Sequence, residues 1–201
     1  MARTTAASKR PTPEAPTLAF ATPQAWDAWL AKHHANSGGL WLKLAKKASG
    51  TASVTYPEAL TVALAWGWID GQKRGLDATH WLQKFTPRKP KSLWSKINRD
   101  KALALIASGA MQPAGLAEVE RAQADGRWDA AYAGSKTITV PDDLAAALAA
   151  DKRAAARFAT LNAANRFAVL FRVHTAKKAE TRAKRIAQFV AMLARGETLH
   201  P

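Results

Sequence analysis

The segment 55–98 constrains the fold of this chain more than any other part of the sequence. Its first residues, Thr55–Glu58, supply a threonine N-cap, a proline in the first turn and a glutamate that completes a capping box. The next residues, 59–66, are apolar on nearly every face, as in a helix that its own domain encloses. We therefore predict a buried helix that Gly67 ends or bends.

Two alternating runs follow this helix. In the first run, 68–73, side chains alternate with a period of two, so that Asp70 points away from Ile69. In the second run, 81–86, Trp, Gln and Phe alternate with Leu, Lys and Thr. Because Gly75–Asp77 supplies a turn between the runs, we predict an antiparallel hairpin.

The residues before this segment indicate an α+β fold. A helix is predicted to open at Thr22–Pro23 and to end by Asn36–Gly39, and residues 40–45 alternate as a strand does. The order helix, strand, helix, strand, strand is typical of a small antiparallel or mixed sheet with helices packed against it.

The basic loop after the hairpin leads into a further helix. Its predicted cap is Ser92 or Ser95, because a serine hydroxyl accepts a bond from an amide of the first turn. The apolar stripe predicted for this helix comprises Ile97, Ala102, Leu105 and Ile106.

Composition along the chain predicts three parts. Residues 1–17 hold three Pro and basic side chains with few apolar residues, so we predict a flexible basic tail. Residues 18–135 form the α+β domain. Residues 136–201 read as successive helices, and we predict a helical C-terminal region packed on the first domain. The apolar face of its last helix comprises Ile186, Phe189, Val190 and Leu193.

Composition also limits the chemistry. The chain has no Cys, which removes disulfides, thiolate chemistry and Cys-based metal sites, and its five His are scattered. The sequence lacks a P-loop, a dinucleotide fingerprint and a nucleophile elbow, so no metal and no cofactor is predicted. It contains no long apolar run and no secretory h-region, so the expected location is the cytoplasm.

The charge of the chain favours an anionic partner. Thirty Lys and Arg stand against fifteen Asp and Glu, which gives a formal charge of +15. Such a charge attracts nucleic acid, phosphorylated metabolites or an acidic membrane surface, and does not by itself choose among them.

The first basic segment is 73–101, which holds nine Lys or Arg against two Asp and also contains three aromatic residues. Cations beside planar rings suit phosphate neutralisation and base stacking. The other interpretation is a solvated strand face whose Trp belong to the core. The anion-binding residues predicted here are Lys73, Arg74, Trp81, Lys84, Arg88, Lys89, Lys91, Trp94 and Lys96.

A second basic segment lies at the start of the last helix, where exposed amides and the helix dipole also favour an anion. A solvated helix face is the alternative. The binding residues predicted here are Lys177, Lys178, Arg182 and Arg185. If the two basic segments converge in space, they form one groove, and the nucleic-acid hypothesis gains.

Asp70 is the candidate acid or base. It lies on a strand end between two Gly and near two cations, although a structural ion pair is the ordinary explanation of such a carboxylate. The rival hypothesis is therefore an enzyme for a small anionic metabolite, with Asp70 as general base and Lys73, Arg88 or Lys96 holding the anion. A third hypothesis is a protein-interaction module with an exposed patch of Trp, which burial of all eight Trp would dismiss.

Several motifs occur in the same order as in one known family. They include Phe20–Pro23, Gly39–Lys43, Gly67–Lys73, Phe85–Arg88, Trp94–Asn98, Met111–Leu116 and Ala176–Arg182. On these residues the chain, from about Phe20 to its C-terminus, resembles the YdeI/OmpD-associated family of bacteriocin-protection proteins. The resemblance implies a stress-related or protective role, and carries over no catalytic residue. We therefore predict non-catalytic binding of an anionic partner, with nucleic acid as a candidate.

Overall fold

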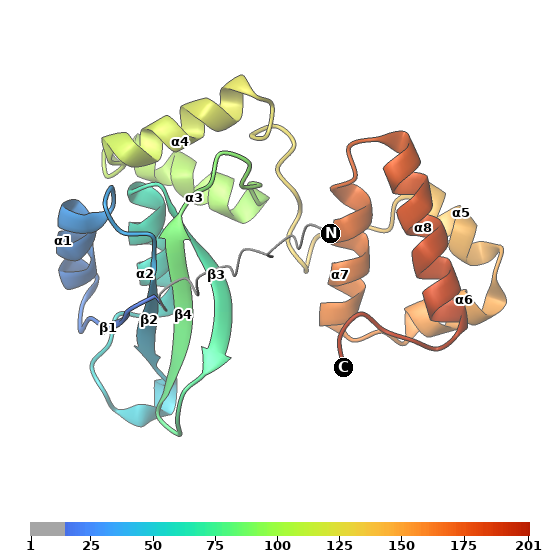
Figure 1. The fold of residues 1–201 in the computed structure, drawn as a ribbon, viewed down its shortest axis with the longest axis horizontal. Coiled ribbons are helices and arrows are strands. Elements are labelled where there is room, and N and C mark those ends of the chain that lie inside the picture. Colours follow the sequence, from blue (N-terminus) through green and yellow to red (C-terminus); the bar gives the residue numbers. More distant parts are fainter. Residues whose placement is uncertain (1–14) are drawn as a thin grey trace, which may run out of the picture. The chain divides into compact units, whose positions relative to one another are not determined.

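The computed structural model describes residues 15–201. These residues form an α+β fold, as predicted (Figure 1). The elements are β1 (Thr17–Ala19), α1 (Pro23–His33), β2 (Leu40–Ala45), the 3₁₀ turn η1 (Lys47–Ser49), α2 (Tyr56–Ala65), β3 (Trp68–Gly75), β4 (His80–Pro87), α3 (Lys96–Ala107), α4 (Pro113–Ala124), α5 (Asp142–Ala149), α6 (Lys152–Ala159), α7 (Ala163–His174) and α8 (Ala179–Ala194).

The chain divides into two compact units. The first comprises the chain up to Pro90 together with Ala104–Arg121, and the second comprises Lys91–Leu103 and Ala122–Pro201. The division passes through α3 and α4, and the predicted domain boundaries stay a prediction. Residues 1–14 of the predicted tail lie outside the described residues, and Thr17 begins β1.

The first unit contains a mixed sheet with the strand order β1-β2-β4-β3. The hairpin of β3 and β4 is antiparallel, as predicted, with Asp70 opposite Phe85 and a bulge between Asp70 and Lys73. Strand β2 pairs with β4 antiparallel and with β1 parallel. Strand β1 is short and was not predicted, because its three residues carry no alternating pattern.

The helix α2 begins as its sequence predicts. The Thr55 hydroxyl caps the amide of Glu58, and the Glu58 carboxylate accepts a bond of 2.8 Å from the amide of Thr55. Both bonds satisfy amides that lack a partner within the helix. The hydrogen bonds from Thr55 lower the pKa of the Glu58 carboxyl. Gly67 follows α2 with a φ of 72° and turns the chain into β3.

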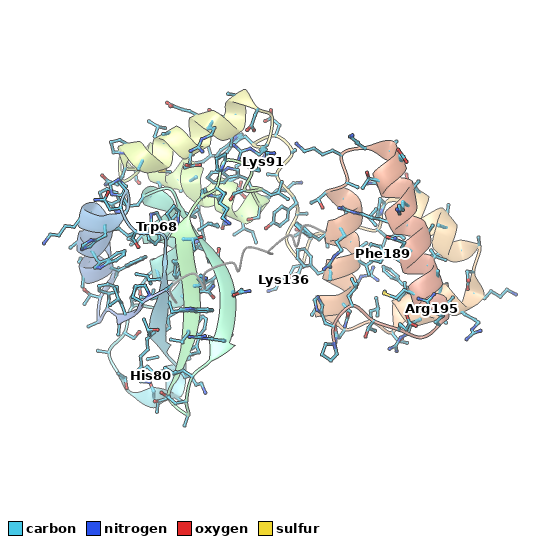
Figure 2. All side chains as sticks on the ribbon, in the orientation of Figure 1. Trp68, His80, Lys91, Lys136, Phe189 and Arg195 are labelled. Atoms are coloured by element: carbon cyan, nitrogen blue, oxygen red, sulfur yellow. The ribbon has the colours of Figure 1, made fainter. Side chains whose placement is uncertain are left out.

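Aromatic rings form the core of the first unit. The ring of Trp26, from α1, lies 5.8 Å from that of Phe85 in β4 and 6.2 Å edge-on from that of Trp68 in β3. Its indole N–H donates to the carbonyl of Ala59 in α2. Helices α1 and α2 therefore cover the sheet face that carries Phe85, and Figure 2 shows Trp68 inside this unit.

The approach to β2 depends on Gly39. This residue has a φ of 125°, and a Cβ atom there would lie 2.7 Å from the carbonyl oxygen of Phe85 and 2.7 Å from Cγ2 of Thr86. Only glycine combines this backbone conformation with such a close approach to a neighbouring strand. The neighbouring Gly38 has open space around the equivalent position.

The second unit has its own core, formed by α5, α6, α7 and α8. The predicted apolar face of α8 is confirmed for Ile186, Phe189 and Leu193, which are buried, while Val190 is partly buried against them. Figure 2 labels Phe189 on this helix. Helix α3 begins after Ser95, whose hydroxyl accepts a bond from the amide of Asn98.

The apolar stripe predicted for α3 is partly wrong. Ala102 and Leu105 are buried, but the side chain of Ile97 is 56% exposed and that of Ile106 is 39% exposed. Helical spacing identifies positions on one face and does not show how far along the helix that face stays covered. Among residues 15–201, no helix combines the length and the apolar character needed to cross a bilayer.

Candidate anion-binding site

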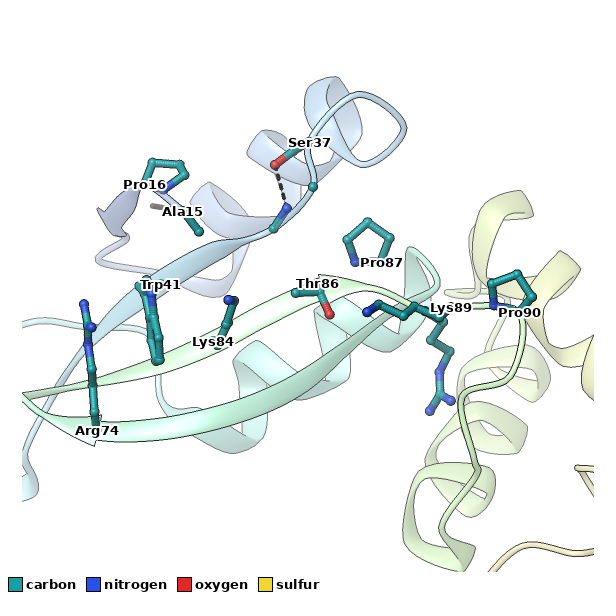
Figure 3. A pocket seen from close by; sticks show the side chains of 13 residues that line it. Ala15, Pro16, Ser37, Trp41, Arg74, Lys84, Thr86, Pro87, Lys89 and Pro90 are labelled. Carbon is teal, nitrogen blue, oxygen red and sulfur yellow. Dashed lines mark hydrogen bonds between the residues drawn. The ribbon is translucent and has the colours of Figure 1, made fainter. Parts of the chain in front are cut away.

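A hollow of about 920 Å³ opens on the first unit (Figure 3). It is bounded by the start of β2, the end of β4 and the loop that follows β4. The lining residues are Ala15, Pro16, Ser37, Gly38, Gly39, Trp41, Arg74, Lys84, Thr86, Pro87, Arg88, Lys89 and Pro90.

Four of the predicted anion-binding residues meet in this hollow. They are Arg74, Lys84, Arg88 and Lys89, and the lining residues that the structure describes include no Asp or Glu. A concave surface lined by charges of one sign concentrates ions of the other sign. Four cations that are separated by up to 15 positions in the sequence thus line one hollow.

Strand register places two of these cations beside an indole ring. Lys84 in β4 is the direct partner of Trp41 in β2, and Arg74 in β3 lies opposite Leu82 in β4. Because residues two apart on a strand share a face, Lys84 and Leu82 point to the same side of the sheet as Arg74 and Trp41. The Arg74 guanidinium carbon lies 4.2 Å from the centre of a Trp41 ring, and Lys84 Nζ lies 5.5 Å from it (Figure 3).

The other two cations follow the end of β4. The prediction that the chain leaves the sheet at Thr86 is wrong by two residues, because β4 runs to Pro87, which is paired with Trp68 in β3, and the loop begins at Arg88. The amide of Arg88 donates to the carbonyl of Gly67 at 3.0 Å, and the side chain of Arg88 is only 5% exposed. Lys89 is exposed at the rim. Arg88 thus shapes the wall, whereas Lys89 can reach toward a bound anion.

Opposite this wall, the loop before β2 borders the hollow. Within this loop, the Ser37 hydroxyl accepts a bond of 3.2 Å from the amide of Gly39 (Figure 3).

Lys73 and Trp81 do not line the hollow. Their strand positions put them on the other sheet face, where Lys73 Nζ lies 4.5 Å from the centre of a Trp81 ring and Trp81 lies near the ring of Tyr56. Their predicted part in binding stays a prediction.

Asp70 also lies away from the hollow. Its carboxylate accepts a bond of 2.8 Å from the hydroxyl of Tyr56, and its side chain is partly buried. Of the residues proposed to act with it, Arg88 lines the hollow and Lys73 does not.

The second unit holds the remaining predicted residues. Lys96 and Lys177 line one hollow of about 500 Å³, together with Asp129 and His174. Lys91 and Lys178 are exposed beyond it. Lys96 of the first basic segment and Lys177 of the second therefore line the same hollow within this unit.

Two predicted residues of the second unit are engaged in internal contacts. Trp94 is 2% exposed, and its ring packs edge-on against Trp128 with the centres 4.9 Å apart, so neither face is open to a base. The Arg182 guanidinium donates to both carboxylate oxygens of Asp143 and to the carbonyl of Val173. The hydrogen bond from Arg182 lowers the pKa of the Asp143 carboxyl.

Arg185 is engaged similarly, because its guanidinium donates to the carbonyl of Arg172. These contacts tie α8 to α5 and α7. Arg182 and Arg185 are thus cations of the helical framework.

The Trp residues do not form an exposed patch. Trp26, Trp41, Trp68, Trp94 and Trp128 are buried, and Trp29, Trp66 and Trp81 are half-buried. The interaction-module hypothesis therefore loses the surface on which it depended. Among residues 15–201, no group of three or more His, Asp or Glu is placed to hold a metal ion.

Two family models match the chain. A model for "Bacteriocin-protection, YdeI or OmpD-Associated" proteins matches residues 137–196, and a model for a domain of unknown function (DUF8412) matches residues 18–118. The chain belongs to the DUF8412 family over residues 18–118 and carries a YdeI/OmpD-associated domain in its C-terminal part. Comparison with curated proteins and with solved structures finds no match.

The two matches divide the motifs on which the resemblance rests. Those from Phe20 to Leu116 fall in the DUF8412 domain, and Ala176–Arg182 falls in the YdeI/OmpD-associated domain. The basic hollow, apart from Ala15 and Pro16, belongs to the DUF8412 domain.

Sequence reasoning missed Trp41 as a residue of this site. The available signal was its alternation with Leu40 and Leu42, which puts Trp41 on the same face as Lys43 and not with the core leucines. Its cation neighbours come from β3 and β4, and only the pairing of the strands reveals them.

Proposed function

We propose that this protein binds an anionic partner, and specifically nucleic acid, in the basic hollow of its DUF8412 domain. The observation that carries the proposal is that Arg74, Lys84, Arg88 and Lys89 line the same hollow. Phosphate contacts with Lys and Arg supply most of the affinity of proteins for nucleic acid.

Nucleic acid suits this site better than a small metabolite does. Sites for small molecules have few polar groups, whereas four cations line this hollow. The formal charge of +15 would also steer a polyanion toward the protein over long distances. A chain of phosphates can contact the cations of the sheet and those of the loop at the same time.

The second unit offers a smaller number of candidate phosphate contacts. Lys96 and Lys177 share a hollow and are candidates for further phosphate contacts, but Asp129 lies in the same hollow and offsets part of their charge. The family description names protection against bacteriocins, and we propose nucleic-acid binding in the cytoplasm as the molecular activity behind such a role.

The enzyme hypothesis has less support. It requires Asp70 to face a bound anion, and Asp70 instead accepts a bond from Tyr56 outside the hollow.

Salt dependence tests the proposal. We expect a single-stranded oligonucleotide to bind with an affinity that falls steeply with salt, with a slope of log K against log salt of about −2 for phosphate contacts by Arg74, Lys84 and Lys89. The slope is measured by electrophoretic shift or anisotropy between low and physiological salt. An affinity that stays flat with salt, or no binding at low salt, would remove the proposal.

A further inference from the structure

Trp41 is the aromatic residue among the described residues that line the basic hollow. We propose that Trp41 is a stacking platform for an unpaired base, so that the partner of this site is single-stranded nucleic acid. This inference rests on the proposed function, because the phosphates of the same strand would occupy the cations around the ring.

The position of Trp41 in the sheet supports this role. Strand β2 is an inner strand of the sheet, and Trp41 points to the face opposite the one that α1 and α2 cover. The ring lines the hollow, in contrast to the core ring of Trp68. An aromatic side chain on an inner strand, with cations on the next strands, is an arrangement that binds single strands by stacking and phosphate contacts together.

Two cations lie beside the ring of Trp41 in the free protein. Arg74 and Lys84 both end on flexible side chains, and each lies within cation–π distance of the ring. A bound strand offers each cation a phosphate, and offers the ring a base. A base would thus replace a cation over the face of Trp41, and the displaced cation would bind a neighbouring phosphate beside the ring.

The magnitudes favour this exchange. An exposed cation–π contact changes an equilibrium by about two- to fivefold, whereas stacking of one base contributes roughly 5- to 150-fold to affinity. The displaced cation gains a phosphate contact in addition. A duplex keeps its bases stacked and paired, so it cannot offer Trp41 an open base face.

The other aromatic candidates of the basic segment do not meet these conditions. Trp94 packs against Trp128 in the second unit, and Trp81 lies on the other face of the sheet beside Tyr56. Trp41 is therefore the ring that the hollow itself presents.

Tryptophan fluorescence with two polyanions tests the inference. The full chain is titrated with a short single-stranded oligonucleotide and with inorganic polyphosphate, which has the charges but no bases. We expect both to bind, and only the oligonucleotide to quench the fluorescence strongly. The Trp41→Phe variant is expected to keep most of the oligonucleotide affinity and to lose most of the quenching.

The Trp41→Leu variant removes the ring. Its affinity for the oligonucleotide is expected to fall at least fivefold, while its affinity for polyphosphate stays within twofold of the natural protein. Equal affinity of the Leu variant and the natural protein for the oligonucleotide would overturn the stacking role and leave anion binding in place. Failure of both polyanions to bind the natural protein would instead refute the proposed function, and the inference with it.

A measurement on the Phe variant keeps the test valid if the Leu variant does not fold. Phe retains a planar ring, so the fold is preserved and only the fluorescent group at this position is lost. Quenching that persists unchanged in Trp41→Phe would place the stacked base on another indole and overturn the inference.

Discussion

Reversal of two charges in the basic hollow is expected to lower the affinity for a single-stranded oligonucleotide by about 100-fold. The variant is Lys84→Glu with Lys89→Glu, which changes one cation on β4 and one at the rim. Each replacement removes a phosphate contact and adds repulsion, and together these cost about 3 kcal/mol of binding free energy. The magnitude of the salt slope is expected to fall by about 1.4, because two contacts are lost.

A matched variant controls for net charge. Lys32→Glu with Lys47→Glu changes two exposed lysines of the same unit that lie outside this hollow, and both double variants reduce the formal charge from +15 by four. We expect the control to lose less than fivefold in affinity. Equal losses in the two double variants would show that overall charge, and not this hollow, determines binding.

The largest expected effect on stability comes from Gly39→Ala. The added Cβ would meet the carbonyl of Phe85 and the side chain of Thr86, and the φ of 125° is strained for any other residue. Because a backbone atom cannot yield as a flexible side chain does, we expect a loss of about 3 kcal/mol in the free energy of unfolding. Denaturant unfolding of the Gly39→Ala variant and of the natural protein measures this loss.

Gly38→Ala is the matched control for that variant. It adds the same methyl group one residue earlier, where nothing lies within 4 Å and no positive φ is needed. We expect a change of less than about 0.5 kcal/mol in the free energy of unfolding. If Gly39→Ala were as stable as Gly38→Ala, the close approach of β2 to β4 at this point would not hold in solution.

Local signals predicted much of the first unit. The capping box at Thr55 and Glu58 fixed the start of α2, because cap chemistry depends on residues three positions apart. The alternation over β3 and β4 gave the hairpin, since the turn joins strands that are neighbours in sequence. Helix α1 and the apolar face of α8 followed from spacing in the same way.

The parts that sequence did not predict depend on partners distant in the chain. The pairing of Trp41 with Lys84, and the place of Arg74 beside that ring, arise from the strand order β1-β2-β4-β3. The ion pair of Arg182 with Asp143 joins residues 39 positions apart, so the charge of α8 alone looked available for binding. Local periodicity contains no information on such partners.

The burial of individual Trp side chains was the other property that the sequence did not predict. Trp94 and Trp81 occur among the same cations in sequence, yet Trp94 packs against Trp128 from a later segment. A basic segment with interleaved Trp therefore predicts a charged surface better than it predicts which ring a base can reach.

The most direct test of the central claim maps where a nucleic acid contacts the protein. A photoreactive single-stranded oligonucleotide is crosslinked to the full chain at low salt, and the modified peptides are identified by mass spectrometry. We expect the adducts to concentrate on the peptides that contain Trp41 and Lys84–Lys89. Adducts confined to the segment 177–185, with none on the DUF8412 domain, would contradict the assignment of binding to the basic hollow.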